Sequence, residues 1–387
     1  MGETICEIIR KAEDNYKTGS TQLGEYVSFS LHDTIERIIA YLNSKHITGD
    51  TDSLGREKPF FNIVIAAVNI WYRATDIDRK DIIIRPDKGS NTIAAFLASV
   101  HLQEWMKRER FGTFLNEWGR TMAQFGSAVS KFVVKDGELI PTVVPWSRLI
   151  VDPIDFDALP RIERFYKTPS QLRKMDYLDQ VTIEKLIESK TARKTTMGSN
   201  KDNQDEFIEL YEVHGKLPAA LLLREDKRKD KDWKTYRQQM HIVSFVETNK
   251  GYDDFTLYSG KESEDPYIKT DLIPEEGRTL SIGAVEYLFD AQWMQNHTIK
   301  NMKDTLDLSS KLIFQTADAR FTNKNVLSAI ENGDILIHNL NQPLTQLNDR
   351  SIDMNALQNF ANQWRVLSQE ITSTPDAQRG INPPSGT

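Results

Sequence analysis

The sequence predicts an α+β fold in which helical regions flank an inserted module of short strands. Apolar residues recur at helical spacing through most of residues 1–130. The period changes to alternation over residues 127–146, on both sides of Asp136-Gly137, which indicates a hairpin. Short apolar runs separated by polar turns fill residues 207–260, and helical patterns return after residue 280. Strands and helices that alternate in blocks of this kind are typical of the α+β class.

The helices expected in the N-terminal region have individual start and stop signals. SFSLHDTIERIIAYLNSKH carries Ile35 and Ile38 on one face, and Ser30 is its candidate N-cap. In PFFNIVIAAVNIWYRAT, Pro59 is expected in the first helical turn. NTIAAFLASVHLQEWMKRERF and TFLNEWGRTMAQFG predict further helices, the second closed by Gly126. The intervening DIIIRPDKG is expected to be a short strand.

The middle of the chain is predicted to consist mostly of strands. RLIVDP follows the hairpin as a strand that ends at Pro153. A helix comes next, with Thr168 as its N-cap and Pro169 at its first position. After a polar linker at residues 189–206, the expected strands are FIELYEVHG, LPAALLL, HIVSFVE and DFTLYSG. Basic residues crowd the turn REDKRKDKDWKTYRQQ that separates the second of these runs from the third.

The segment LSIGAVEYLFDAQWMQNHTIKNMKDTLDLSSKLIF, residues 280–314, is predicted to form one long helix with an amide-rich belt around Trp293. Its apolar residues shift around the helix axis near Trp293, which favours a helix packed against copies of itself over a buried active site or a lone solvated helix. KLIFQTAD and DILIHNL are then expected as strands, and IDMNALQNFANQWRVLSQEITS as a final long helix. The chain ends in a run rich in proline, glycine and serine.

Composition and motifs give no support to an enzyme. The net charge of −7 disfavours a sequence-reading DNA regulator, and the single cysteine excludes a disulfide framework or a cysteine-based zinc site. Phosphate-binding glycine loops and nucleophile elbows are absent. The seven histidines are scattered, and DPIDFD lacks the central glycine of a calcium loop. We therefore expect a chain that is not an enzyme and needs neither metal nor cofactor.

Three segments stand out within this order of elements. They are VVPWSRLIVDP (143–153), RTLSIGAVEYLFDAQWMQNHTIKNMKD (278–304) and GINPPSGT (380–387). The run AQFGSAVSKFVVKDGELI precedes the first of them. With these segments in this order, the sequence resembles the portal proteins of tailed bacteriophages over most of its length. The order of the elements contributes more to the resemblance than any single segment does.

The resemblance implies a helix-rich portal-type subunit with a wing, a two-helix stem and a small α/β clip, assembling as a ring. The C-terminal crown of such subunits would be absent or not covered. The expected parts are a helical wing region with a hairpin (1–167), a first stem helix and linker (168–206), an inserted α/β clip (207–275), a second stem helix (276–310), wing strands with the tunnel loop and a long helix (311–372), and an exit towards a crown (373–387).

The resemblance also implies a function. The ring, typically of twelve subunits, would form the portal vertex of a capsid, through which double-stranded DNA is packaged and later ejected without sequence preference. Its partners would be other copies of the chain, the major capsid protein, the terminase motor and head–tail adaptor proteins, with no membrane involved. The protein would assemble in the host cytoplasm and reside in the virion. Two alternatives stay open: another ring or adaptor protein of the connector, and a metal-dependent DNA-processing enzyme.

Candidate site residues follow from these expectations. The tunnel loop would line the DNA channel with Asn339, Asn341, Gln342, Thr345, Gln346 and Asn348. The stem would present Lys300 and Lys303 to the channel, although an ordinary solvated helix face explains both equally well. The expected stem interface between subunits consists of Gln292, Trp293, Gln295, Asn296 and His297. The clip tip, a solvated hairpin turn or a surface for a charged partner, carries Arg224, Lys227, Arg228, Lys229, Lys231 and Lys234.

Overall fold

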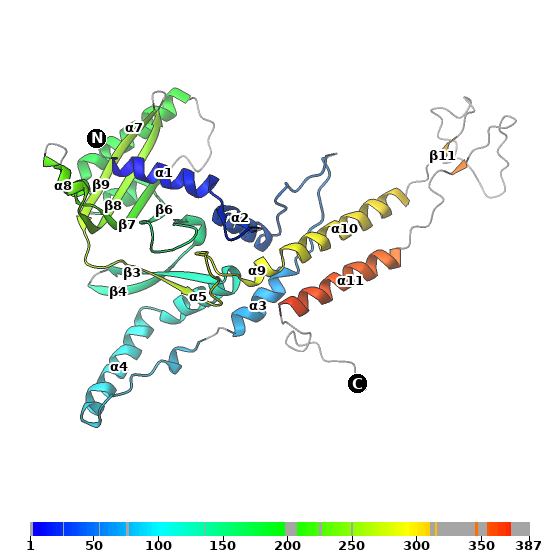
Figure 1. Cartoon of the computed structure of the whole chain (residues 1–387), viewed down its shortest axis with the longest axis horizontal. Helices are drawn as coiled ribbons and strands as arrows, with labels where there is room; N and C mark the ends of the chain where they lie inside the picture. Colours follow the sequence, from blue (N-terminus) through cyan, green and yellow to red (C-terminus); the bar gives the residue numbers. More distant parts are fainter. Residues whose placement is uncertain are drawn as a thin grey trace. The chain divides into compact units, whose positions relative to one another are not determined.

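The protein mixes helices and antiparallel sheets and is of the α+β class, as the sequence predicts (Figure 1). The structure is a computed structural model that describes residues 3–25, 27–53, 55–74, 77–135, 137–197, 207–223, 227–248, 251–309, 314–315, 345–346 and 354–372. Two compact units make up the chain. The first unit consists of residues 1–43 and 64–287, and the second of residues 44–63 and 288–387. Among the described helices, none combines the length and the apolar character that crossing a membrane requires.

A five-stranded antiparallel sheet lies in the first unit, with strand order β5-β6-β7-β8-β9. Its strands are β5 (Leu149–Ile150), β6 (Arg161–Lys167), β7 (Ile208–Pro218), β8 (Tyr236–Thr248) and β9 (Gly251–Lys261). Side chains alternate between the two faces of β7, so Leu210 belongs to one core cluster and Val213 to the other. The register shifts between Ile242 and Val243 of β8, which marks a bulge.

One helix covers each face of this sheet. The helix α1 (Ile5–Thr18) places Cys6 and Ile9 in the cluster that contains Val213. The helix α7 (Gln180–Met197) places Ile183 and Leu186 in the cluster that contains Leu210. A capping box with Thr4 as N-cap starts α1, since its hydroxyl accepts from the backbone N–H of Glu7. The sheet is therefore buried on both faces.

A second, three-stranded sheet has the order β10-β3-β4, with strands β3 (Ser127–Lys135), β4 (Glu138–Val144) and β10 (Tyr267–Asp271). The hairpin predicted around Asp136-Gly137 is confirmed as β3 and β4. Trp146 follows β4 and is fully buried, and its indole Nε1 donates to the carbonyl of Ser127 at 2.8 Å. This bond ties the end of the hairpin back to its start.

The helices of the first unit begin and end mostly where sequence signals place them. They are α2 (Leu31–Leu42), α3 (Val64–Ala74), α4 (Thr92–Arg108), α5 (Phe111–Phe125) and α9 (Ala284–Tyr287). Ser30 caps α2 and Gly126 ends α5 with φ of 79°, as predicted. A Cβ on Gly126 would lie 2.6 Å from the carbonyl carbon of Ile282, so glycine is also required for this close approach.

Short elements complete the first unit. They are β1 (Thr21–Gln22), β2 (Ser28–Phe29), α6 (Pro169–Arg173), α8 (Asp230–Trp233) and the 3-10 turns η1 (Arg79–Asp81), η2 (Gly89–Asn91), η3 (Trp146–Arg148) and η5 (Ala219–Leu222). Thr168 caps α6 with Pro169 at its first position, as expected. That helix lasts little more than one turn before α7 takes over.

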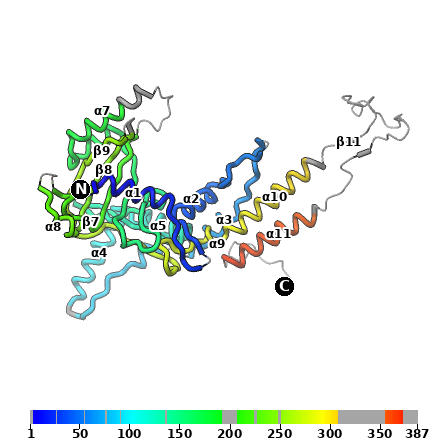
Figure 2. The backbone as a smooth tube through the Cα atoms, turned by 45° about the horizontal axis from the view of Figure 1, so that its top comes forward, coloured from blue at the N-terminus to red at the C-terminus, as the bar shows by residue number. Residues whose placement is uncertain are grey.

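The second unit contains two long helices, α10 (Phe289–Ser309) and α11 (Met354–Ile371), which pack side by side and run antiparallel (Figures 1 and 2). A two-stranded ladder of β11 (Phe314–Gln315) and β12 (Thr345–Gln346) also belongs to it. The expected final helix is thus confirmed as α11. The expected strand DILIHNL lies outside the described residues.

Several local predictions are wrong. Pro59 does not begin a helix, because α3 begins at Val64. The stretch DIIIRPDKG begins at Asp81, the last residue of the turn η1, and forms no strand. LPAALLL ends β7 and continues as η5, so it adds no strand of its own. The long helix expected over residues 280–314 is interrupted at Leu288, where α9 gives way to α10.

The predicted parts also divide differently. Strands β5 and β6, from the expected wing region, share one sheet with β7 to β9 of the expected clip. Strand β10, also from the expected clip, pairs with β3. The helix expected after Thr168 as the first stem element is divided into α6 and α7, and both pack on the five-stranded sheet. In the structure it is α11 that pairs with α10.

Candidate functional site

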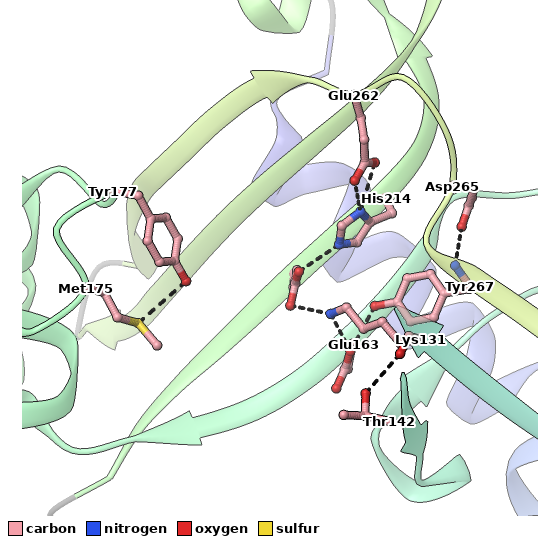
Figure 3. A network of polar contacts seen from close by, with 10 residues as sticks. Lys131, Thr142, Glu163, Met175, Tyr177, His214, Glu262, Asp265 and Tyr267 are labelled. Atoms are coloured by element: carbon pink, nitrogen blue, oxygen red, sulfur yellow. Dashed lines mark hydrogen bonds and ion pairs between the residues drawn. The ribbon is translucent and has the colours of Figure 1, made fainter. Parts of the chain in front are cut away.

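The first unit holds a network of charged side chains between its three-stranded and its five-stranded sheet (Figure 3). Lys131 of β3 places its Nζ 2.9 Å from Glu163 Oε2 and 2.7 Å from Glu212 Oε2. Glu163 lies on β6 and Glu212 on β7, so one buried cation joins the three-stranded sheet to the five-stranded sheet. None of these residues is among the site residues predicted from the sequence.

The strand register explains why a cation is needed at this place. Glu163 and Glu212 are direct partners across β6 and β7. Like charges directly opposite one another destabilise a strand pair, and burial strengthens the repulsion. Lys131 compensates both carboxylates at once because it reaches them from the other sheet. A buried ion pair that loses one partner leaves an uncompensated charge, so the three side chains depend on one another.

His214 extends the network along β7. It lies two residues after Glu212 and therefore on the same face of the strand. Its Nε2 lies 2.7 Å from Glu212 Oε1, and its Nδ1 lies 2.9 Å from Glu262 Oε2. A neutral imidazole has only one N–H to donate, whereas both nitrogens here face a carboxylate. The geometry therefore fits a doubly protonated, charged His214.

Tyr267 of β10 closes the network on the side of the three-stranded sheet. Its hydroxyl donates to Glu163 Oε2 at 2.9 Å, and its ring lies edge-on to His214 with centroids 5.3 Å apart. The ammonium of Lys131 lies 5.1 Å from the centre of the same ring. Burial and the neighbouring carboxylates raise the pKa of Tyr267 well above its ordinary value, so it remains a donor.

The pKa shifts agree with a set of complete ion pairs. Burial alone would lower the pKa of Lys131, but Glu212 and Glu163 outweigh it and the pKa is raised. Burial likewise opposes the charge on His214, and Glu212 and Glu262 raise its pKa nevertheless. Burial would raise the pKa of Glu212, yet His214 and Lys131 bring it down to about 2. Lys131 and Glu212 are therefore charged at neutral pH, and the direction of the shift favours the charged form of His214.

Glu212 is poorly suited to act as a general acid or base. A general acid or base works best with a pKa near the operating pH, whereas Glu212 titrates far below neutrality. A pocket of about 530 Å³ lies beside Asp265, and one of about 370 Å³ beside Tyr267. The walls of these two pockets contain none of Lys131, Glu212 and His214. Across the described ranges, no group of three or more His, Cys, Asp or Glu side chains is arranged to hold a metal ion.

The structure gives the amides of the expected stem interface a different role. Gln292 of α10 accepts from the backbone N–H of Ile63 at 2.9 Å and donates to the carbonyl of Phe61 at 2.8 Å. Asn296 accepts from the N–H of Phe61 at 3.2 Å and from Gln292 at 3.0 Å. Both amides are buried within the second unit. They pair with backbone groups of the same chain, so these hydrogen bonds are made within the subunit, and a role of the two amides between subunits stays a prediction.

The other members of the expected stem interface differ in exposure. Trp293 and His297 are exposed and stack on each other with ring centroids 5.4 Å apart. Gln295 is buried, and its Oε1 has no hydrogen-bond partner among the described residues. Of this set, Trp293 and His297 are thus the side chains available to a neighbouring subunit.

The two stem lysines are not equivalent. Lys303 is exposed, and its Nζ donates to the carbonyl of Glu57 at 3.1 Å within the second unit. Lys300 is partly exposed. The contact of Lys303 anchors the segment of residues 44–63, so a change at this position affects the second unit as well as any surface role.

The expected clip tip surrounds α8 in the connection from β7 to β8. Lys227, Lys229, Lys231 and Lys234 are exposed there. Arg228 is less exposed, and its Nε donates to the carbonyl of Leu223 at 3.1 Å. Arg224 lies outside the described residues. The described part of the turn is therefore a solvated basic surface, as both interpretations of the sequence require.

Most of the expected tunnel loop cannot be placed. Asn339, Asn341, Gln342 and Asn348 lie outside the described residues. The backbone of Thr345–Gln346 forms β12, paired with Phe314–Gln315. The expectation that this loop lines a channel therefore stays a prediction.

Comparisons with known proteins add no assignment. Neither a scan against models of protein families nor a search of curated proteins returned a match to the chain.

Replacing Lys131 should uncouple the two sheets. Lys131→Met leaves Glu163 and Glu212 buried without a cation, and we expect a loss of about 3–5 kcal/mol in the free energy of unfolding. Urea denaturation followed by circular dichroism measures it. Lys185→Met, on the exposed side of α7, is the matched control and should change stability by no more than about 0.5 kcal/mol. Equal losses in the two variants would contradict the role of Lys131.

His214 should make stability fall as the pH rises. Its pKa is raised above 6.5, so its stabilisation is fully present below pH 6.5 and is lost as the pH rises through the folded-state pKa. Wild type should therefore exceed His214→Gln in stability most at low pH. Urea denaturation of both proteins from neutral to alkaline pH tests this. A gap that stays constant or widens with pH would refute the charged state of His214.

His241 supplies an internal check on that experiment. Burial lowers its pKa to about 4, so it costs stability only as the pH falls from 6.5 towards 4. Measurements above pH 6.5 therefore isolate His214.

Gln292 should hold the segment of residues 44–63 against α10. Gln292→Leu keeps the volume but leaves the N–H of Ile63 and the carbonyl of Phe61 without a partner, at about 2–4 kcal/mol for the two groups. Hydrogen exchange read by mass spectrometry should speed up at residues 60–64. Asn301→Leu, on the exposed side of α10, should leave this exchange unchanged. Unaltered exchange in Gln292→Leu would show that the amide is dispensable.

Proposed function

We propose that this chain is the ring-forming subunit of a bacteriophage portal vertex, a channel for packaging and ejecting double-stranded DNA. The resemblance in the order of elements motivates the proposal. The buried charge network supports a structural chain, because its groups are committed to one another. None of the described features favours the alternative of a metal-dependent DNA-processing enzyme.

The observation that carries the proposal is a row of exposed apolar side chains on α11, which we call the stripe. Phe360, Leu367 and Ile371 recur at helical spacing on this helix and are exposed, with Trp364 between them partly so. The buried positions of the same segment, Ala361, Ser368 and Thr372, are small or polar. A helix that keeps its large apolar side chains in solvent is adapted to cover by another protein surface.

A neighbouring copy of the chain is the cover that the proposal requires. Exposed Trp293 and Leu306 add apolar surface on α10 within the same unit. In a ring, every subunit presents the same surfaces to its neighbours, so each stripe is covered without leaving an unpaired edge. DNA would pass along the ring axis without base-specific contacts. The terminase and later the adaptor proteins would dock on the exposed basic surface around α8.

Electron microscopy of the purified protein in negative stain tests this proposal. We expect closed rings with an axial channel about as wide as a DNA duplex. Leu367→Glu should abolish the rings and leave folded monomers, because a charge in the stripe cannot be buried unpaired. Arg365→Glu, an exposed neighbour on α11, should keep them. Monomers or two-fold dimers of the wild type at every concentration tested would overturn the proposal.

A further inference from the structure

The first unit has an arm that exposes many apolar side chains to solvent. The arm comprises residues 77–108, that is η1, an extended segment, η2 and α4. Gln103 of α4 donates to the carbonyls of Arg79 and Ile82 at 3.4 and 3.2 Å, so the extended segment runs beside the helix. Figures 1 and 2 show α4 extending away from the sheets of its own unit.

The exposed part of α4 has no charged side chain. From Thr92 the helix continues without any until Glu104. Ile93, Phe96 and Leu97 are nevertheless 77%, 66% and 61% exposed. Ala94 and Ala98 are exposed as well, so the apolar surface extends around most of the helix. A helix that is apolar on most sides is normally buried in a protein core.

The edge of the arm carries two basic residues, Arg85 and Lys88, with the exposed Asp87 between them. Arg85 and Lys88 of the extended segment are exposed, and neither forms an ion pair with a described side chain. Ile83 and Ile84 beside them are also exposed. The arm therefore presents an apolar surface bordered by unpaired positive charge, in a chain whose net charge is −7.

A surface of opposite character lies elsewhere on the same unit. We call it the acceptor surface: residues 154–159 between β5 and β6, with residues 264–268 at the start of β10. Ile154, Leu159 and Ile268 are each about half exposed there. Asp155 and Glu264 are exposed among them, and neither pairs with a described cation. Two pockets that share Asp157 hollow this surface.

We propose that the arm of one copy docks on the acceptor surface of a neighbouring copy. The apolar side chains match, and the basic border of the arm faces the acidic border of the acceptor. Arm and acceptor are different surfaces, so the contact can repeat head-to-tail from copy to copy, and in a closed ring every arm and every acceptor is used. The inference rests on the proposed ring and names the surfaces that build it.

Crosslinking between engineered cysteines tests the docking. The native Cys6 should not react with the crosslinker, because it is buried and burial raises the pKa of its thiol to about 12. Leu97→Cys combined with Leu159→Cys, treated with a flexible bis-maleimide, should give a ladder of covalent oligomers beyond the dimer. The control combines Leu97→Cys with Val181→Cys, exposed on α7 outside the acceptor surface, and should not.

Charge exchange provides a second readout. Arg85→Glu with Lys88→Glu should reduce the ring fraction at least tenfold at the lowest concentration at which wild-type rings persist. Asp155→Lys with Glu264→Lys should do the same. The four changes together restore opposite charges at every contact and should restore the rings. Failure of the combined variant to recover, with each pair folded, would overturn the docking.

The outcomes separate this inference from the proposed function. Wild-type rings without a ladder would overturn the arm contact and leave the ring subunit standing. In that case another protein or another part of the chain would cover the arm. A wild type that remains monomeric would overturn both. A ladder that matches the number of subunits seen in the rings would support both.

Discussion

Two glutamates that face each other across neighbouring strands set the constraint on which the first unit depends. Glu163 and Glu212 can share one side of a sheet only if a cation reaches both, and Lys131 does so from the other sheet. This requirement fixes how β3 lies against β6 and β7. The pairing of β10 with β3 then brings Tyr267 over the same carboxylates. His214 pairs with Glu262, so the residue that follows β9 also belongs to the charge network.

The polar groups of the charge network and of Gln292 are buried and paired within the chain, whereas several large apolar side chains are exposed. The buried polar groups of the charge network and of Gln292 find their partners inside the chain. Large apolar side chains, by contrast, remain exposed on α4 and α11 at regular helical spacing. In a monomer these apolar side chains stay in water, and no free energy of burial is gained from them. A subunit would gain binding energy from covering them, which is why we propose that copies of the chain pack on these surfaces.

Capping residues and turn residues in the sequence were sufficient to predict helix ends and the hairpin. The N-cap Ser30, the C-terminal Gly126 and the hairpin at Asp136-Gly137 were predicted because each depends on neighbouring residues. The charge network was not, because Lys131 and Glu212 are far apart in sequence and meet only through the sheet registers. The amides of α10 were expected at a subunit interface. The hydrogen-bond partners of Gln292 are backbone groups, and a sequence does not reveal which backbone groups a side chain will meet.

The central claim is that this chain functions as a ring subunit whose exposed helices are covered by copies of itself. A cryo-electron microscopy reconstruction of the assembled protein tests it most directly. We expect rotational symmetry, an axial channel wide enough for duplex DNA, and density of a neighbouring subunit against both α4 and α11. A two-fold dimer, a closed axis, or a ring in which both helices remain exposed to solvent would contradict this account.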